Sequence, residues 1–188
     1  GPNFAGTGNG GASSSTAFDL FSSDSGNRSY TFVKGAETLS ATSGEIITGL
    51  NEFVDPETLD IDYLLMGPGD ASSKTNTQAI AAKVLQVTSG RKDCVGFISP
   101  YYGDVVGVTS SATQTSNVVD FYSNLQATSF GVFDSGWKYI YDRFADKYRY
   151  VPLNGDVAGL CASVTANGTP WFSPAGLNRG AIRGCLLY

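Results

Sequence analysis

The sequence contains no histidine, and this absence removes several kinds of catalytic and metal-binding site at once. Histidine is the most common general base, the most common zinc ligand, and the usual activator of serine and cysteine nucleophiles. Only three cysteines are present, and the separations of Cys94, Cys161 and Cys185 fit neither a zinc-binding pair nor a disulfide framework. Cys94 and Cys161 lie in apolar segments, which favours burial. We therefore expect no catalytic, metal or cofactor site.

Charge is also scarce, at 15% of residues, and the 12 basic and 17 acidic side chains leave a net charge of −5. This balance argues against nucleic acid as a partner, because phosphate binding requires clustered lysine and arginine. No apolar run reaches the ~18 residues of a membrane span, so we expect no membrane insertion. Low charge with 23 glycines suits a surface that packs against other copies, although a β-rich protein without an assembly role is an alternative.

The first 60 residues divide into a polar segment, short β-type patterns and one helix. Residues 1–16 are mostly glycine, serine, threonine and asparagine, which predicts a flexible arm. Residues 17–39 contain short strand-like patterns. A helical apolar stripe follows over residues 46–54, with Ser43 as its expected N-cap and Asp55-Pro56 as its end.

The middle of the chain alternates strand and helix patterns. We predict buried strands at residues 61–66 and 94–98, and a third strand at residues 129–133. Helices are expected at residues 75–89, with Gly90 just beyond the end, and at 117–125, after a loop at 101–116. Strands separated by helices pair in parallel through right-handed crossovers.

The periodicity changes after residue 133. Strands at residues 137–141 and 148–151 predict an antiparallel hairpin, and a last helix is expected at 157–164, capped by Asn154 or Asp156. The predicted fold class is α/β, with three layers, a mainly parallel sheet flanked by helices, and an antiparallel aromatic hairpin at the edge. We expect an arm at 1–16, one domain at 17–183 that divides into two subdomains near residue 128 in one interpretation, and a truncated end at 184–188.

Two motifs could indicate ligand chemistry. The turn Gly67-Pro68-Gly69-Asp70 lies between a strand and a helix, where phosphate loops occur, but it matches neither phosphate-binding pattern and its proline removes a donor. Five aspartates could meet at strand ends, and they are Asp60, Asp62, Asp70, Asp93 and Asp104. Their spacing does not require acid-base catalysis or a magnesium site, and aspartate is a common turn residue. We interpret both features as structural.

The remaining unusual residues are aromatic. We expect the hairpin aromatics on both of its faces, which predicts one core face and one contact face, with stacking of sugars or bases as the alternative. Trp171 and Arg179 lie in a loop with proline and glycine, and this combination of a tryptophan and an arginine resembles an interface hot spot. The alternative is that Trp171 covers the last helix as a lid. The candidate assembly residues are Trp137, Tyr139, Trp171 and Arg179.

Two stretches near the end of the chain resemble a known family. Residues 148–162 read YRYVPLNGDVAGLCA, and residues 171–180 read WFSPAGLNRG. Both are similar to the tail sheath proteins of contractile-tailed bacteriophages. The similarity is close over residues 129–183 and collinear but looser over residues 30–126.

The resemblance implies a structural subunit of a viral contractile tail sheath. Its partners would be other copies in a helical sheath and the tail tube protein, and it would be made in the host cytoplasm and located in the virion. Contraction of such a sheath drives the tube through the host envelope. The alternative is a Rossmann-like binding domain or enzyme, which would need a crevice with converging polar groups at the carboxyl ends of the strands.

Overall fold

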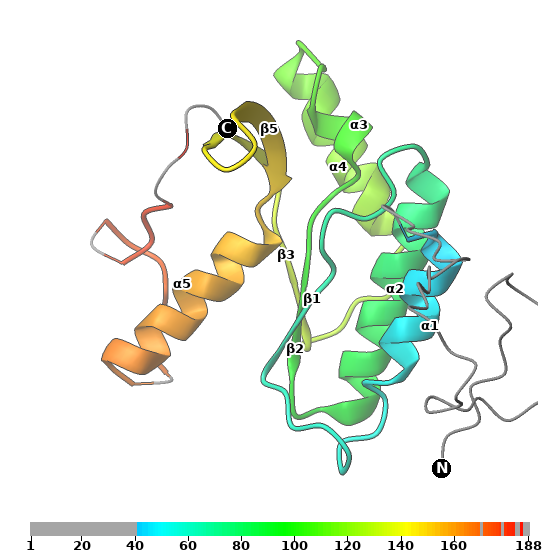
Figure 1. The fold of residues 1–188 in the computed structure, drawn as a ribbon, viewed down its shortest axis with the longest axis vertical. Helices are drawn as coiled ribbons and strands as arrows, with labels where there is room; N and C mark the ends of the chain where they lie inside the picture. Colours follow the sequence, from blue (N-terminus) through cyan, green and yellow to red (C-terminus); the bar gives the residue numbers. More distant parts are fainter. Residues whose placement is uncertain (1–40, 170, 178, 183–184, 186–188) are drawn as a thin grey trace, which may run out of the picture. The chain divides into compact units, whose positions relative to one another are not determined.

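The computed structural model describes residues 41–169, 171–177, 179–182 and 185 (Figure 1). The predicted arm at residues 1–16 and the strand-like patterns at 17–39 lie outside the described residues. The C-terminal residues 186–188 lie outside it too. The described residues belong to one compact unit, and all elements below lie in it.

Three short strands form the central sheet, as the alternating pattern predicted. They are β1 (Tyr63–Leu65), β2 (Val95–Ile98) and β3 (Gly131–Phe133), in the order β1-β2-β3. Both pairs are parallel, with Leu64 opposite Gly96 and Phe97 opposite Val132. The prediction of one parallel sheet is confirmed.

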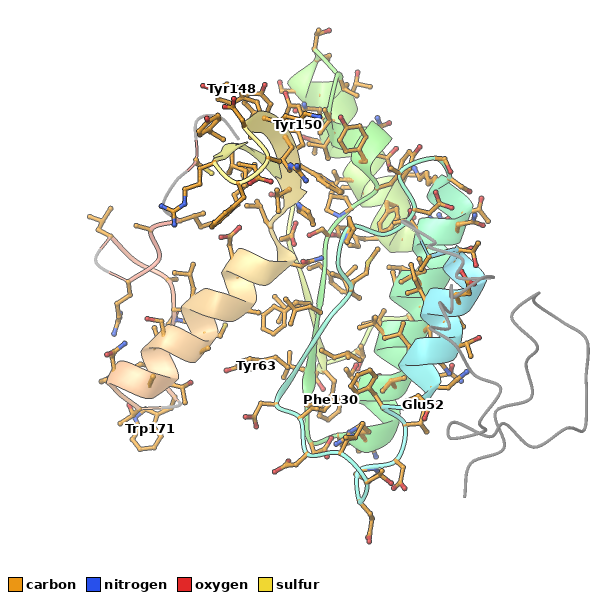
Figure 2. The ribbon with its side chains drawn as sticks, in the orientation of Figure 1. Glu52, Tyr63, Phe130, Tyr148, Tyr150 and Trp171 are labelled. Carbon is orange, nitrogen blue, oxygen red and sulfur yellow. The ribbon has the colours of Figure 1, made fainter. Side chains whose placement is uncertain are left out.

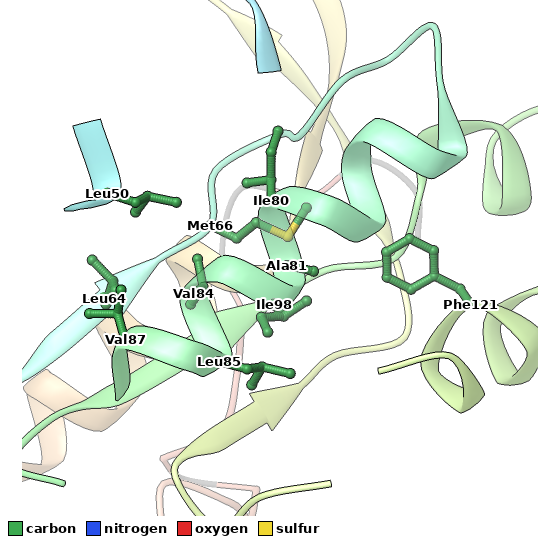
Figure 3. Packing of buried hydrophobic residues seen from close by; sticks show 10 residues of the cluster. All are labelled: Leu50, Leu64, Met66, Ile80, Ala81, Val84, Leu85, Val87, Ile98 and Phe121. Atoms are coloured by element: carbon green, nitrogen blue, oxygen red, sulfur yellow. The ribbon is translucent and has the colours of Figure 1, made fainter. Parts of the chain in front are cut away.

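Helices cover both faces of this sheet, which confirms the three-layer prediction. On one side lies α2 (Lys74–Arg91), backed by α1 (Ser43–Asn51) and α4 (Ser111–Ser123); on the other lies α5 (Asn154–Asn167) (Figure 1). The buried residues of α2 form one broad face of the helix, because the sheet and the neighbouring helices both cover it. Ile80 and Val84 are fully buried there, and Phe121 of α4 closes the same cluster (Figure 3).

The helix boundaries correct several predictions. Thr42, not Ser43, caps α1 through a reciprocal capping box with Glu45. Gly90 lies inside α2, and Lys92 takes the left-handed conformation (φ 64°) that ends the helix.

The predicted loop at residues 101–116 is partly helical. It contains a short helix, α3 (Tyr102–Val105), and α4 starts six residues earlier than expected, because the Ser110 hydroxyl caps it. Serine and threonine have weak helix propensity, so the sequence alone hides this first turn. The last helix, α5, also starts early, at Asn154, and neither expected residue caps it.

The aromatic hairpin consists of β4 (Trp137–Asp142) and β5 (Lys147–Pro152), which follow the edge strand β3. The two strands pair antiparallel and form a sheet of their own. A four-residue tip joins them, and Asp146 in it takes a positive φ of 51°. The predicted hairpin is confirmed.

Two glycines test how tightly α2 packs on the sheet. A Cβ at Gly96 would lie 2.8 Å from Cγ1 of Val84, whose branched side chain is stiff in a helix. A Cβ at Gly90 of α2 would meet nothing within 4 Å. We expect Gly96→Ala to lower the free energy of unfolding by about 1–3 kcal/mol.

The matched control is Gly90→Ala, which should raise the free energy of unfolding by about 0.5–1 kcal/mol, because alanine loses less backbone entropy in a helix. Urea denaturation followed by circular dichroism measures both variants. Equal effects of the two substitutions would mean that α2 does not press on β2.

Candidate assembly surface

The strand register places all five hairpin aromatics on one face. Tyr139 lies opposite Tyr150, Tyr141 lies opposite Tyr148, and Trp137 lies opposite Pro152. Directly paired residues point to the same side of an antiparallel ladder. The expectation of aromatics on both faces is therefore wrong: the other face carries mostly charged residues, such as Lys138 and Arg149. Within each strand the aromatic residues are two positions apart, so alternation places them on the same face, and the register shows that the two strands share this face.

The base of the aromatic face is part of the core. Trp137 is 4% exposed, and its indole nitrogen donates a hydrogen bond to the Pro100 carbonyl at 2.9 Å. Tyr102 of α3 packs edge-on against both Trp137 and Tyr150, with ring centroids 5.2 and 6.1 Å away. In this chain Trp137 therefore anchors the hairpin to the sheet, and its buried indole leaves little surface for a contact with a partner. Tyr139 is half-buried and stacks on Tyr148.

The outer end of the hairpin is exposed. Tyr141 and Tyr148 pack against each other with centroids 5.0 Å apart, and Tyr148 is 58% exposed (Figure 2). Phe144 at the tip is 89% exposed, with the Arg143 guanidinium 5.1 Å from its ring centroid. Tyr141 donates a hydrogen bond of 2.5 Å to Asp146 across the tip. Exposed aromatic and arginine side chains of this kind are enriched at protein interfaces.

The second candidate region follows α5, and the lid interpretation of Trp171 is wrong. Trp171 is 80% exposed, and the neighbouring Phe172 instead faces a pocket of ≈ 620 Å³. The Arg179 guanidinium lies 5.4 Å from the Phe172 ring centroid. The other lining residues come from α5 and from the segment after it; they are Leu160, Ser163, Val164, Asn167, Gly168 and Ala181. Trp171 and Arg179 are thus both accessible.

A polar junction fills the region beyond the carboxyl ends of the parallel strands. The Ser99 hydroxyl donates a hydrogen bond of 2.5 Å to the carboxylate of Asp134 and accepts one from the Asn154 backbone at 3.0 Å. The Asn154 amide donates to the Gly67 carbonyl at 2.8 Å. These bonds tie β1, β2 and β3 to the start of α5, and they explain why Asn154 does not cap its own helix.

Burial changes the acidity of this junction. It raises the pKa of Asp134 to about 6, against the opposing effect of the hydrogen bonds from Ser99 and the Gly136 backbone. Burial also raises the pKa of Tyr122, whose hydroxyl donates to the Asp134 carbonyl at 2.6 Å. Asp134 was not among the predicted site residues; its place directly after the third predicted strand was the available indication.

The five aspartates do not meet at one edge of the sheet. Asp60, Asp62 and Asp93 precede β1 and β2, and so lie towards the amino ends of the strands. Asp70 accepts hydrogen bonds from Ser72 and Asn76 at the start of α2, in the Gly67–Asp70 turn that we interpreted as structural. Asp104 is buried and forms an ion pair of 3.0 Å with Lys74.

Within the described residues, no group of three or more histidine, cysteine or acidic side chains could hold a metal ion. The helices among them include none with the length and apolar character needed to cross a bilayer. The three cysteines are free thiols; Cys94 is buried as predicted, whereas Cys161 is only half-buried. Burial raises the pKa of both thiols, so neither is activated as a nucleophile.

Comparison with known proteins shows which proteins the chain is related to. The chain is 31% identical to the tail sheath protein of Vibrio phage KVP40 over 169 residues, which are 82% of this chain and 25% of that protein. It is also 31% identical to the tail sheath protein of Enterobacteria phage T4 over 150 residues, or 75% of this chain and 23% of the relative.

A third relative is the tail sheath protein of Salmonella phage ViI, with 34% identity over 98 residues, or 52% of this chain and 15% of the relative. No protein-family model matches. The chain spans at most about a quarter of the length of these relatives. Its sequence identity to three sheath proteins, over up to four fifths of its own residues, places it in the tail sheath protein family.

Proposed function

We propose that this chain is part of a structural subunit of a phage tail sheath, a component of the virion that assembles from copies of itself around the tail tube. The observation that carries the proposal is the collinear identity to the sheath proteins of phages KVP40 and T4. In the finer form of the proposal, the assembled sheath contracts and drives the tube through the host envelope. The role is mechanical and requires no catalytic residue.

The accessible aromatic residues support an assembly role. The outer end of the hairpin and Trp171 expose large apolar rings to water. Because burial of apolar surface is favourable, packing these rings against a neighbouring copy would stabilise a contact. Tyr139, Trp171 and Arg179 remain the candidate contact residues. Trp137 leaves this set because the fold already buries it.

The Rossmann-like alternative lacks support at the place where it needs a site. A ligand of such a domain would bind beyond the carboxyl ends of the parallel strands. There, Ser99, Asp134 and Asn154 bond to one another, and Trp137 bonds to Pro100. The pocket near Arg179 lies instead beside α5 and the segment after it.

Self-association of the purified chain tests the proposal. Sedimentation velocity should show a sedimentation coefficient that rises with protein concentration, and negative-stain electron microscopy should show ordered oligomers. Trp171→Ala should reduce association, because a central aromatic residue contributes strongly to an interface, with Val119→Ala as the exposed apolar control on α4.

A panel of nucleotides in a thermal-shift assay separates the two functions. A chain that stays monomeric at every concentration, and whose melting temperature rises with the logarithm of nucleotide concentration, would support the Rossmann-like alternative.

A further inference from the structure

We propose that the exposed hairpin end of one copy, residues 141–149, binds the acidic loop, residues 52–62, of a second copy. The proposal rests on the proposed self-assembly and names the two surfaces that meet.

The hairpin end combines apolar rings with an excess of positive charge in an otherwise acidic chain. It carries three basic and two acidic residues, whereas the whole chain has a net charge of −5. Asp142 already pairs with Arg149 at 3.0 Å, and Asp146 accepts the Tyr141 hydroxyl. Among the described residues, Arg143 and Lys147 have no acidic partner. The hairpin end therefore presents two unpaired cations beside exposed aromatic rings.

The acidic loop has the complementary character. It contains five acidic residues and no basic one, and they are Glu52, Asp55, Glu57, Asp60 and Asp62. Two apolar side chains are exposed among them, Val54 at 50% and Leu59 at 39%. A surface with unpaired carboxylates around apolar side chains matches a partner with cations around aromatic rings.

A buried arginine holds the acidic loop in shape. The guanidinium of Arg91 donates hydrogen bonds to three loop carbonyls: Phe53 at 2.9 Å, Asp55 at 3.2 Å and Leu59 at 2.7 Å. Asp55 further accepts bonds from Thr58 and from the Glu57 backbone. A loop that is already ordered loses little entropy on binding, so it offers a preformed surface.

The two surfaces lie at opposite ends of the same molecule. The acidic loop precedes β1 and lies at the amino ends of the parallel strands, whereas the hairpin follows β3 at their carboxyl ends. In Figure 2, Glu52 and Tyr148 are accordingly far apart. One copy cannot close this contact on itself. Contact between two different surfaces of identical copies is head-to-tail, and it generates rings or helical filaments.

Photocrosslinking in the complete 188-residue chain tests this contact. Phe144 is replaced by the photoreactive p-benzoylphenylalanine, and ¹⁵N-labelled and unlabelled copies are mixed before illumination. Mass spectrometry then separates crosslinks between copies from those within one copy. We expect the crosslinks between copies to map to residues 52–62. The same photoreactive group at Val119, another exposed apolar position, should give none in that loop.

Charge reversal tests the electrostatic part of the proposal. Arg143→Glu with Lys147→Glu should lower the crosslink yield about tenfold, because like charges then face each other. Mixing this variant with a partner copy that carries Glu57→Lys and Asp60→Lys should restore the yield. Raising the salt concentration should weaken the original contact, because salt screens exposed charges.

The outcomes separate this contact from the proposed function. Ordered oligomers whose Phe144 crosslinks map elsewhere, or no crosslinks between copies at all, would overturn the contact. Crosslinks to residues 52–62 in pairs of chains that form no larger assemblies would support the contact and count against the sheath function.

Discussion

Trp137→Ala should lower the free energy of unfolding by about 3–5 kcal/mol, the largest effect that we expect from a single substitution. The indole is 4% exposed, packs against Tyr102 and donates its nitrogen to the Pro100 carbonyl. Truncation would leave a cavity at the junction of β2, α3 and the hairpin, and it would leave that carbonyl without this donor.

The chain's other tryptophan provides the matched control. Trp171 is 80% exposed, so Trp171→Ala should change the stability of the isolated chain by less than about 0.5 kcal/mol. Urea denaturation followed by circular dichroism measures both variants without relying on tryptophan emission. Similar losses for the two substitutions would contradict the exposed placement of Trp171. A negligible loss for Trp137→Ala would contradict the anchoring of the hairpin.

The contrast between the two tryptophans shows where sequence reasoning was limited. Both occur in aromatic segments, and both were candidates for an interface. Their exposure is decided by contacts distant in sequence: Pro100 and Tyr102 cover Trp137, whereas the segment after α5 leaves Trp171 uncovered. A local pattern does not contain such contacts.

Elements with strong local patterns were predicted well. The parallel strands are short apolar runs bounded by turn residues, and the helical stripe in α2 spans several turns, so each pattern identifies its element. The start of α4 was missed because a polar first turn depends on the Ser110 cap more than on apolar periodicity. The acidic loop was visible only as scattered aspartates, because the ordering contacts come from Arg91, more than thirty residues away.

The polar junction should make the free energy of unfolding depend on pH through Asp134. Asp134 has a folded-state pKa of about 6 against an ordinary value of 3.8, because burial disfavours its ionised form. Between these two pH values the folded chain binds more protons than the unfolded chain, so this group's stabilisation falls as the pH rises. It is fully present below pH 3.8 and lost above pH 6, and the difference amounts to about 3 kcal/mol.

Asp134→Asn isolates this effect, since the amide has nearly the same size, does not titrate and can still accept the Gly136 N–H bond. The stability of the natural chain relative to the variant, measured by urea denaturation from pH 4 to pH 7.5, should fall by about 2 kcal/mol as the pH rises, because a small part of the effect is already lost at pH 4. Asp70 and Asp93 have lowered pKa values and produce the opposite slope, but both proteins share them, so their effect cancels in the difference. The negative charge of Asp156, which pairs with Lys138 at 2.6 Å, also raises the pKa of Asp134, so it contributes to the expected decrease in the same direction. A difference that stays constant or grows with pH would mean that Asp134 is not held in a desolvated site, and that the junction of the three strands with α5 is open to water.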